Sequence, residues 1–201
     1  MNKETATSSQ GENHGLEARL RRIEDRQAIY DVIVRYCRGV DRSDPDLVVS
    51  AFHDDAIDNH FGVVMPFREA IGTLKAPRSA DGRPTSKTTS MHNICNVLIE
   101  LDGDVARSET YVTVIVRIPR EGSAVDWTHA GRYVDRFERR NGEWRIAYRT
   151  VVYDLERFDQ VVPAPEGISQ ARYLDNAVRG QRGRADFSYE IFNSSEPTRQ
   201  A

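Results

Sequence analysis

The chain has 201 residues and a formal net charge of −3, and its length suits one domain with a single core plus extensions. Acidic and basic side chains nearly balance, so the composition does not indicate attraction to nucleic acid or to an anionic membrane. No apolar run reaches the roughly 18 residues of a membrane-spanning helix, and residues 1–14 lack the apolar core of a signal peptide. We therefore expect a cytoplasmic protein without a nucleic-acid or membrane partner.

The first part of the chain predicts a tail followed by helices. Residues 1–14 are polar and show no apolar period, so we expect them to be disordered. Over residues 16–40, apolar side chains recur at steps of three and four, which predicts one long helix. Asp44 can then cap a second helix that has Pro45 at its first position, runs through Phe52 and stops just after it.

A short strand, a short helix and a loop are predicted next. Residues 57–64 are a strand candidate, and Pro66 starts a third helix that reaches about Leu74. Residues 76–87 are rich in Pro, Gly, Ser and Arg, a composition that is typical of a loop.

Long strands dominate the second half of the chain. Alternating apolar and polar residues and intervening turn residues predict strands over about 90–101, 105–119, 126–139 and 143–154. Asn141-Gly142 is the strongest short hairpin signal, and it joins the last two strands. Helices followed by a strand meander predict an α+β fold, in which a cone-shaped, curved antiparallel sheet wraps round the long N-terminal helix and leaves an apolar pocket.

The C-terminal part is predicted to be an extension of the domain formed by residues 15–156. Residues 157–201 begin with a Pro- and Gly-containing linker, and residues 169–178 can form a helix. The Arg-rich run 179–184 is expected to be solvated, and the apolar cluster within 187–192 is too hydrophobic for a free tail. We expect the extension to pack on the barrel or on a neighbouring subunit.

Three stretches of the sequence resemble a known family. Residues 16–56, 92–104 and 131–154 (GRYVDRFERRNGEWRIAYRTVVYD) resemble the SnoaL-like family of the nuclear transport factor 2-like superfamily. The resemblance implies the cone-shaped α+β fold and assembly into dimers or trimers. It does not by itself imply one activity, because this fold carries many chemistries and some members are not enzymes.

Asp41 and His92 are the leading candidates for chemistry. Asp41 lies at the end of the long helix, where the negative end of the helix dipole disfavours a carboxylate that has no partner. His92 opens a predicted strand, and a carboxylate that holds one imidazole nitrogen leaves the other free as a base. The pair is similar to those of hexachlorocyclohexane dehydrochlorinase, scytalone dehydratase and bile-acid 7α-dehydratase, and this implies abstraction of a proton from carbon without a cofactor.

The resemblance does not identify a proton donor for a leaving group. Positions that help catalysis in the two dehydratases correspond to Val114, Ile115, Gly131 and Tyr133, none of which carries the expected side chain. Dehydration is therefore less firmly implied than proton abstraction.

Several further residues are candidates for binding substrate. Tyr36 could support the substrate or pack as a core aromatic, and it lies about 140° from Asp41 round an ideal helix. Both can face one pocket only if the helix unwinds at Gly39. Tyr133 and Tyr148 are candidates for the pocket wall, although core or interface packing is the alternative.

The remaining histidines and the cysteines give weaker signals. His60 and His129 are candidates for the pocket rim. The histidines lack the spacing of metal ligands, so no metal site is expected. Cys37 and Cys95 are expected to be two reduced core thiols.

These patterns predict a cofactor-independent lyase, dehydratase or isomerase that acts on a small hydrophobic, aromatic or polycyclic substrate. Formaldehyde loss from a lignin-type aromatic would be a carbon–carbon variant of the same chemistry. The alternative is a non-catalytic ligand-binding or assembly subunit, such as the β subunits of ring-hydroxylating dioxygenases. We also expect a homotrimer or homodimer, because the apolar strand residues are too numerous for one helix to cover. These residues are Val112, Val114, Val116, Val151 and Tyr153.

Overall fold

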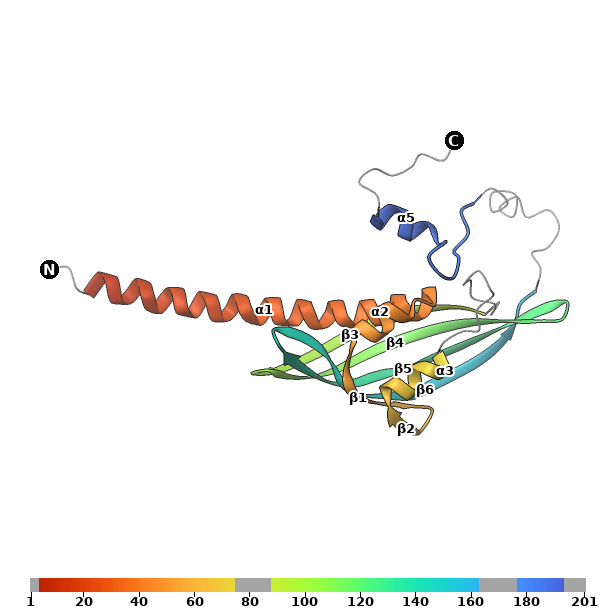
Figure 1. The fold of residues 1–201 in the computed structure, drawn as a ribbon, viewed down its shortest axis with the longest axis horizontal. Helices are drawn as coiled ribbons and strands as arrows, with labels where there is room; N and C mark the ends of the chain where they lie inside the picture. The colour runs from red at the N-terminus through yellow and green to blue at the C-terminus, as the bar shows by residue number, and fades with distance from the viewer. Residues whose placement is uncertain (1–3, 75–87, 163–176, 194–201) are drawn as a thin grey trace.

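The computed structural model describes residues 4–74, 88–162 and 177–193 (Figure 1). The loop predicted over 76–87 and most of the helix predicted over 169–178 lie outside these ranges. Helix α1 spans Glu4–Arg42, so it begins well before the predicted start. The expectation of a disordered tail therefore differs from the structure, and the physical reason is that adding residues to an existing helix is much easier than starting one.

Helix α1 lies against the concave face of the sheet only along its second half (Figure 1). Its buried face carries Ile29, Val32, Ile33, Tyr36 and Cys37. Leu20, Ile23, Tyr30 and Val34 contributed to the apolar pattern of the sequence, yet these side chains are exposed. The N-terminal half of α1 projects past the end of the sheet, so part of its apolar pattern meets no partner among the residues that the structure describes.

Helix α2 spans Pro45–Ser50, and Asp44 caps it as predicted, accepting hydrogen bonds from the backbone N–H groups of the next turn. The helix stops earlier than expected because Phe52 already pairs with Ile146 as the first residue of strand β1, Phe52–His60.

Strand β1 continues into the short strand β2, Val63–Pro66, through a tight turn. Phe61 and Gly62 form the turn, with φ angles of 52° and 77°. Two positive φ angles match the hairpin turn whose twist suits antiparallel strands. Helix α3 follows over Phe67–Leu74, close to its predicted place.

Four long strands complete the sheet. They are β3 (Thr89–Asp102), β4 (Val105–Arg120), β5 (Ser123–Arg140) and β6 (Glu143–Gln160). The strand order is β2-β1-β6-β5-β4-β3. All neighbours are antiparallel except β1 and β6, so the predicted α+β fold is confirmed with a mixed rather than purely antiparallel sheet. Strand β6 also continues beyond the predicted end at residue 154, because it still pairs with the start of β5.

Two irregularities bend the pairing of β5 with β6. The register shifts between Ala130 and Gly131, and again between Arg136 and Phe137. An ideal Cβ built on Gly131 would lie 2.0 Å from the carbonyl oxygen of Val152. Glycine is therefore required where the two backbones approach each other at the first irregularity.

The two faces of the sheet differ from the sequence prediction in one respect. The valines and the tyrosine that were expected to form an interface, Val112, Val114, Val116, Val151 and Tyr153, line the concave interior. The exposed large apolar side chains of the long strands are instead Met91, Leu98, Tyr111, Ile115, Val134, Tyr148, Leu155 and Phe158. Strand alternation explains the exchange, since the neighbours of inward residues point outward.

The described C-terminal segment, residues 177–193, packs on the end of α1 and on α2, and it ends in helix α5, Phe187–Asn193. Tyr189 donates a hydrogen bond to Asp44 (2.6 Å), and the guanidinium of Arg38 lies over the ring of Tyr189. Arg182 donates to Ser43 and to the carbonyl of Thr88, so the Arg-rich run is not wholly solvated as expected. Within the described residues, no helix has the length and apolar character to cross a membrane.

Candidate active site

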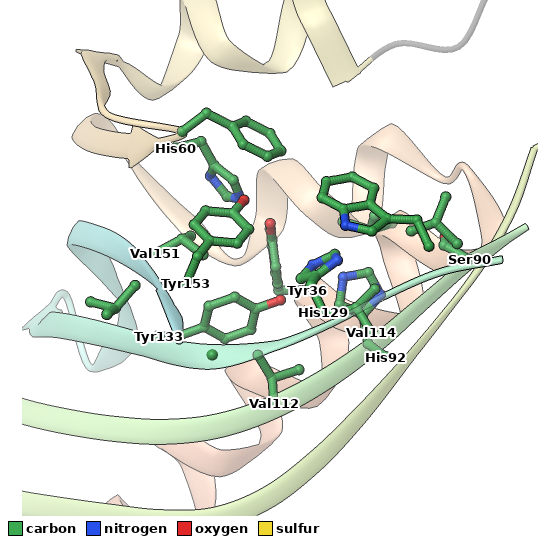
Figure 2. Close-up of a pocket in the computed structure, with 16 residues that line it drawn as sticks. Tyr36, His60, Ser90, His92, Val112, Val114, His129, Tyr133, Val151 and Tyr153 are labelled. Atoms are coloured by element: carbon green, nitrogen blue, oxygen red, sulfur yellow. The ribbon is translucent and has the colours of Figure 1, made fainter. Parts of the chain in front are cut away.

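A cavity of about 200 Å³ lies between the end of α1, the β1–β2 turn and the inner faces of β3, β4, β5 and β6. Its surface is mostly apolar and is formed by valines and aromatic rings, and three histidines face it (Figure 2). The lining residues that matter for the chemistry are Tyr36, His60, His92, Trp127, His129, Tyr133 and Tyr153. The concave sheet therefore encloses space for a small ligand rather than a filled core.

The predicted contact between Asp41 and His92 is present. Asp41 Oδ1 lies 2.6 Å from His92 Nδ1, and Asp41 Oδ2 accepts a hydrogen bond of 3.0 Å from the backbone N–H of His92. Both side chains are largely shielded from solvent. The two contacts fix the ring, and they leave Nε2 as the nitrogen that is free to act in the cavity.

The end of helix α1 does not unwind, contrary to the geometric condition inferred from the sequence. The helix is continuous to Arg42. No unwinding is needed, because Tyr36 lines the cavity whereas Asp41 does not line it and contacts His92 instead. Gly39 is needed for helix packing instead, because a Cβ at this position would lie 2.7 Å from Val48 Cγ2. This glycine lets α2 pack closely against α1.

A buried ion pair supports the two tyrosines of the cavity floor. Arg149 donates from Nε and Nη2 to the carboxylate of Asp135 at 2.8 and 2.7 Å, and the side chains of both are fully buried. The guanidinium lies 4.2 Å from the ring centroid of Tyr36 and 4.1 Å from that of Tyr133. Burial raises the pKa of both tyrosines, so their hydroxyl groups stay protonated at neutral pH.

His60 forms a second contact between an imidazole and a carboxylate. Its Nδ1 lies 2.8 Å from Asp58 Oδ2, and its ring faces the cavity next to Tyr153 (Figure 2). Asp58 is 3% exposed, and its other oxygen has no hydrogen-bond partner among the described residues. Burial, followed by the nearby charge of Asp58, raises the pKa of Tyr153 to about 12.

His129 is the third histidine, and it differs from the other two. Its ring packs on Trp127 at 4.6 Å between centroids, and no carboxylate among the described residues binds it. Burial lowers its pKa, and the neighbouring His92 lowers it further. His129 is therefore neutral at physiological pH and contributes a polar edge to an aromatic wall.

Not every predicted site residue reaches the cavity. Tyr36, Tyr133 and His60 line it, but Tyr148 lies on the other face of β6 with 39% of its surface exposed, so its predicted place in the pocket wall is wrong. Cys37 is buried, and burial raises the pKa of its thiol to about 12, whereas Cys95 is exposed and not a core thiol.

Sequence analysis missed Asp58, Asp135 and Arg149. Asp58 could have been found, because residues two apart on a strand share a face, and this places it beside His60. A buried arginine gives no such signal in a chain with many exposed ones. Within the described ranges, no cluster of three or more His, Cys, Asp or Glu side chains could hold a metal ion.

Comparisons with known proteins agree with this architecture. The pattern of the SnoaL-like domain matches residues 21–150. A search among curated proteins found no match to the chain. Among solved structures, LinA-type3, a hexachlorocyclohexane dehydrochlorinase from Novosphingobium barchaimii LL02, has a TM-score of 0.58 and 19% identity over 72% of this chain and 99% of that one.

Two proteins of Novosphingobium aromaticivorans are also similar. A candidate scytalone dehydratase gives a TM-score of 0.57 with 17% identity, over 74% of this chain and 97% of that one. A candidate aromatic ring hydroxylase gives a TM-score of 0.54 with 26% identity, over 69% of this chain and 94% of that one. The neighbours thus share the fold and include proteins named for different reactions.

Proposed function

Because the chain belongs to the SnoaL-like domain family, and because a histidine held by a carboxylate faces its cavity, we propose that it is a cofactor-independent lyase. Isomerisation, which shares the first step, is the second possible outcome. The observation that carries the proposal is the 2.6 Å contact between Asp41 and His92 beside an apolar cavity. His92 Nε2 is the base that removes a proton from a carbon atom of the substrate.

The neighbours of His92 have supporting roles in this proposal. Asp41 fixes the tautomer and the orientation of the ring, and its charge favours the imidazolium that forms when the proton is taken. Tyr36 offers a protonated hydroxyl to the substrate, and the charge of Arg149 behind its ring favours negative charge that develops nearby.

The cavity lining supports a small hydrophobic, flat substrate. Phe61 stacks on Tyr153 with ring centroids 5.0 Å apart, and Trp127 continues this wall. A lining of aromatic rings and valines favours an aromatic or polycyclic body. The open cavity also favours an enzyme over a purely structural subunit, since a subunit that only supports a partner has no need of an unfilled interior beside a paired histidine.

The base role can be tested without knowing the natural substrate. We expect the protein to exchange the C3 protons of 4-phenylbutan-2-one for deuterium in D₂O, measured by proton NMR. The His92→Ala variant should exchange roughly 10²-fold more slowly, and Asp41→Asn should also be slower. His53→Gln is the matched control, because His53 binds the Glu138 carbonyl away from the cavity. Exchange by a folded His92→Ala variant at the wild-type rate would remove His92 from this role.

Self-association is a further part of the proposal. The outer sheet face and the projecting half of α1 both expose apolar side chains, among them Tyr111, Ile115 and Leu20. Such surfaces usually meet a partner, so we expect a homotrimer or a homodimer. Light scattering at micromolar concentration should give two or three times the chain mass, whereas 22.9 kDa would contradict the proposal.

A further inference from the structure

The cavity contains two imidazole–carboxylate pairs, and only one of them is needed to remove a proton. Asp41 and His92 form the first pair, and Asp58 and His60 form the second. In both pairs Nδ1 contacts the carboxylate, so in both the Nε2 atom remains available on the side of the cavity. The second pair has no role in the proton abstraction proposed above.

The topology of the sheet places the two pairs at different walls of the same cavity. His92 belongs to β3, which is one edge of the sheet, whereas His60 ends β1, which is next to the other edge. The curvature of the sheet brings both strands round the cavity, and Figure 2 shows His60 and His92 on different sides of Tyr36. A substrate between them would be flanked by two imidazoles from different directions.

The contact with Asp58 fixes the orientation of the His60 ring in the cavity wall. Asp58 is 3% exposed, and its Oδ1 has no hydrogen-bond partner among the described residues. Because Asp58 holds Nδ1, Nε2 is the His60 nitrogen that can give a proton to a ligand in the cavity.

We propose that His60 is the general acid that protonates an oxygen leaving group, and that Asp58 is its positioning residue. The inference rests on the proposed function, in which His92 is the base. It narrows the substrate to carbon acids that carry a hydroxyl, alkoxyl or aryloxyl group on the carbon next to the acidic C–H. A halide leaves as a stable anion and would not need this second pair.

The step balances without an oxidant or a reductant. The proton on the α-carbon moves to His92 Nε2, and its electron pair becomes the π bond to the neighbouring carbon. The carbon–oxygen bond breaks with its electron pair on oxygen. The Nε2 proton of His60 then moves to that oxygen, which releases an alcohol, a phenol or water. Exchange with solvent returns a proton to His60 and removes one from His92.

A matched pair of substrates tests the inference. 4-(4-Nitrophenoxy)butan-2-one and 4-(4-methoxyphenoxy)butan-2-one share one carbon acid and give the same enone, but 4-nitrophenolate leaves without a proton and 4-methoxyphenolate is much more basic. We expect His60→Gln to lower release of 4-methoxyphenol by about 10²-fold and release of 4-nitrophenol less than threefold. Asp58→Asn should show the same selectivity to a smaller degree, whereas His92→Ala should slow both reactions.

Each outcome of this experiment decides something. Circular dichroism reports on the folding of every variant independently of activity, because a misfolded protein also loses both reactions. An equal fall of both rates in a folded His60→Gln variant would overturn the inference, since His60 would then act before the bond to oxygen breaks. Unchanged rates would overturn it as well. If wild type exchanges the protons of 4-phenylbutan-2-one but releases neither phenol, the acid role is wrong while the base role stands.

Discussion

One sheet forms both halves of the cone, but the interior of one half is filled by side chains and the interior of the other half is an open cavity. In the packed half, Ile29 and Ile33 of α1 meet Phe137 and Ile146, and all four side chains have no exposed surface. In the open half, Val114 and its inward neighbours face a cavity. Apolar strand residues point inward in both halves, Phe137 and Ile146 in the packed half and Val112 and Val114 in the open half. What differs is how far the helix follows the sheet.

The end of helix α1 separates the two halves. The helix stops at Arg42, and its last turns contribute Tyr36 and Val40 to the cavity wall instead of filling the space. The irregularity at Gly131 bends β5 and β6 at the same level. Because the helix ends before the sheet does, a site remains, and the histidine pairs lie at the edges of that site.

The largest loss of stability should come from breaking the ion pair of Arg149 and Asp135, which lies at the boundary between the two halves. Arg149→Leu leaves the Asp135 carboxylate buried without its partner, and we expect it to lower the free energy of unfolding by about 3–5 kcal/mol. The measurement is urea denaturation. The double variant Arg149→Leu with Asp135→Leu should recover much of the loss, because no unpaired charge remains. A single variant that is as stable as wild type would show that the pair is not essential to the boundary.

A smaller loss of stability is expected when the bend of β5 and β6 at Gly131 is disturbed. Gly131→Ala places a Cβ where the carbonyl oxygen of Val152 lies, and we expect a loss of about 1–3 kcal/mol in unfolding free energy. Gly72→Ala is the control, because it lies in helix α3 with no atom near its added Cβ, and alanine favours a helix. Equal stability of both variants would contradict a tight approach of the backbones at Gly131.

One substitution in each half tests whether side chains are packed more tightly in the packed half than in the open half. Ile146→Val removes one carbon from the packed half, where we expect a loss of about 0.5–1.5 kcal/mol. Val114→Ala removes two carbons from a side chain that is 3% exposed, yet it should cost no more, because Val114 already lacks packing atoms on the cavity side. Urea denaturation of both variants decides this. A clearly larger loss for Val114→Ala would mean that the open half is packed in solution.

The smallest effect concerns the C-terminal segment, and it depends on pH. Burial alone would raise the pKa of Asp186, but hydrogen bonds from Ser188 and Gln181 and the charge of Arg42 outweigh it and lower the pKa to about 2. A lowered pKa in the folded state stabilises the protein above the ordinary aspartate pKa, near 3.9, and this contribution is lost as the pH falls towards 2.

The variant Asp186→Asn should therefore be less stable than wild type at pH 6, and the difference should shrink at pH 2.5. Denaturation with urea at both pH values measures it. A difference that does not change with pH would show that the charge of Asp186 has no part in holding residues 177–193.

The sequence was sufficient for the fold and for the first histidine pair. The cap at Asp44, the Asn141-Gly142 turn and the alternation of β4 depend on neighbouring residues only, so local rules predict them. Asp41 and His92 were found because a family resemblance linked two positions that are far apart in the chain. Local rules alone give no such link.

The wrong placement of Tyr148 and the missed Arg149 have one physical cause in strand β6. Counting outward from the Asn141-Gly142 turn pairs Asp135 with Tyr148, and the inward position of Ile146 also predicts that Tyr148 points inward. The register shift between Arg136 and Phe137 inserts one residue into β6, so Arg149 takes the inward place and pairs with Asp135. A bulge is invisible to a period-two pattern, and it reverses every assignment beyond it.

The contact of residues 177–193 with the end of α1 limits how far this protein can be shortened at its C-terminal end. The family match ends at residue 150, so a boundary drawn from relatives would discard Arg182. Arg182 bonds to Ser43 and Thr88, which lie just beyond Asp41 and just before His92 along the chain. The two chain segments that carry the first histidine pair are thus tied together from outside the shared domain. A shortened protein could keep the fold of its relatives and still lose the alignment of its own base.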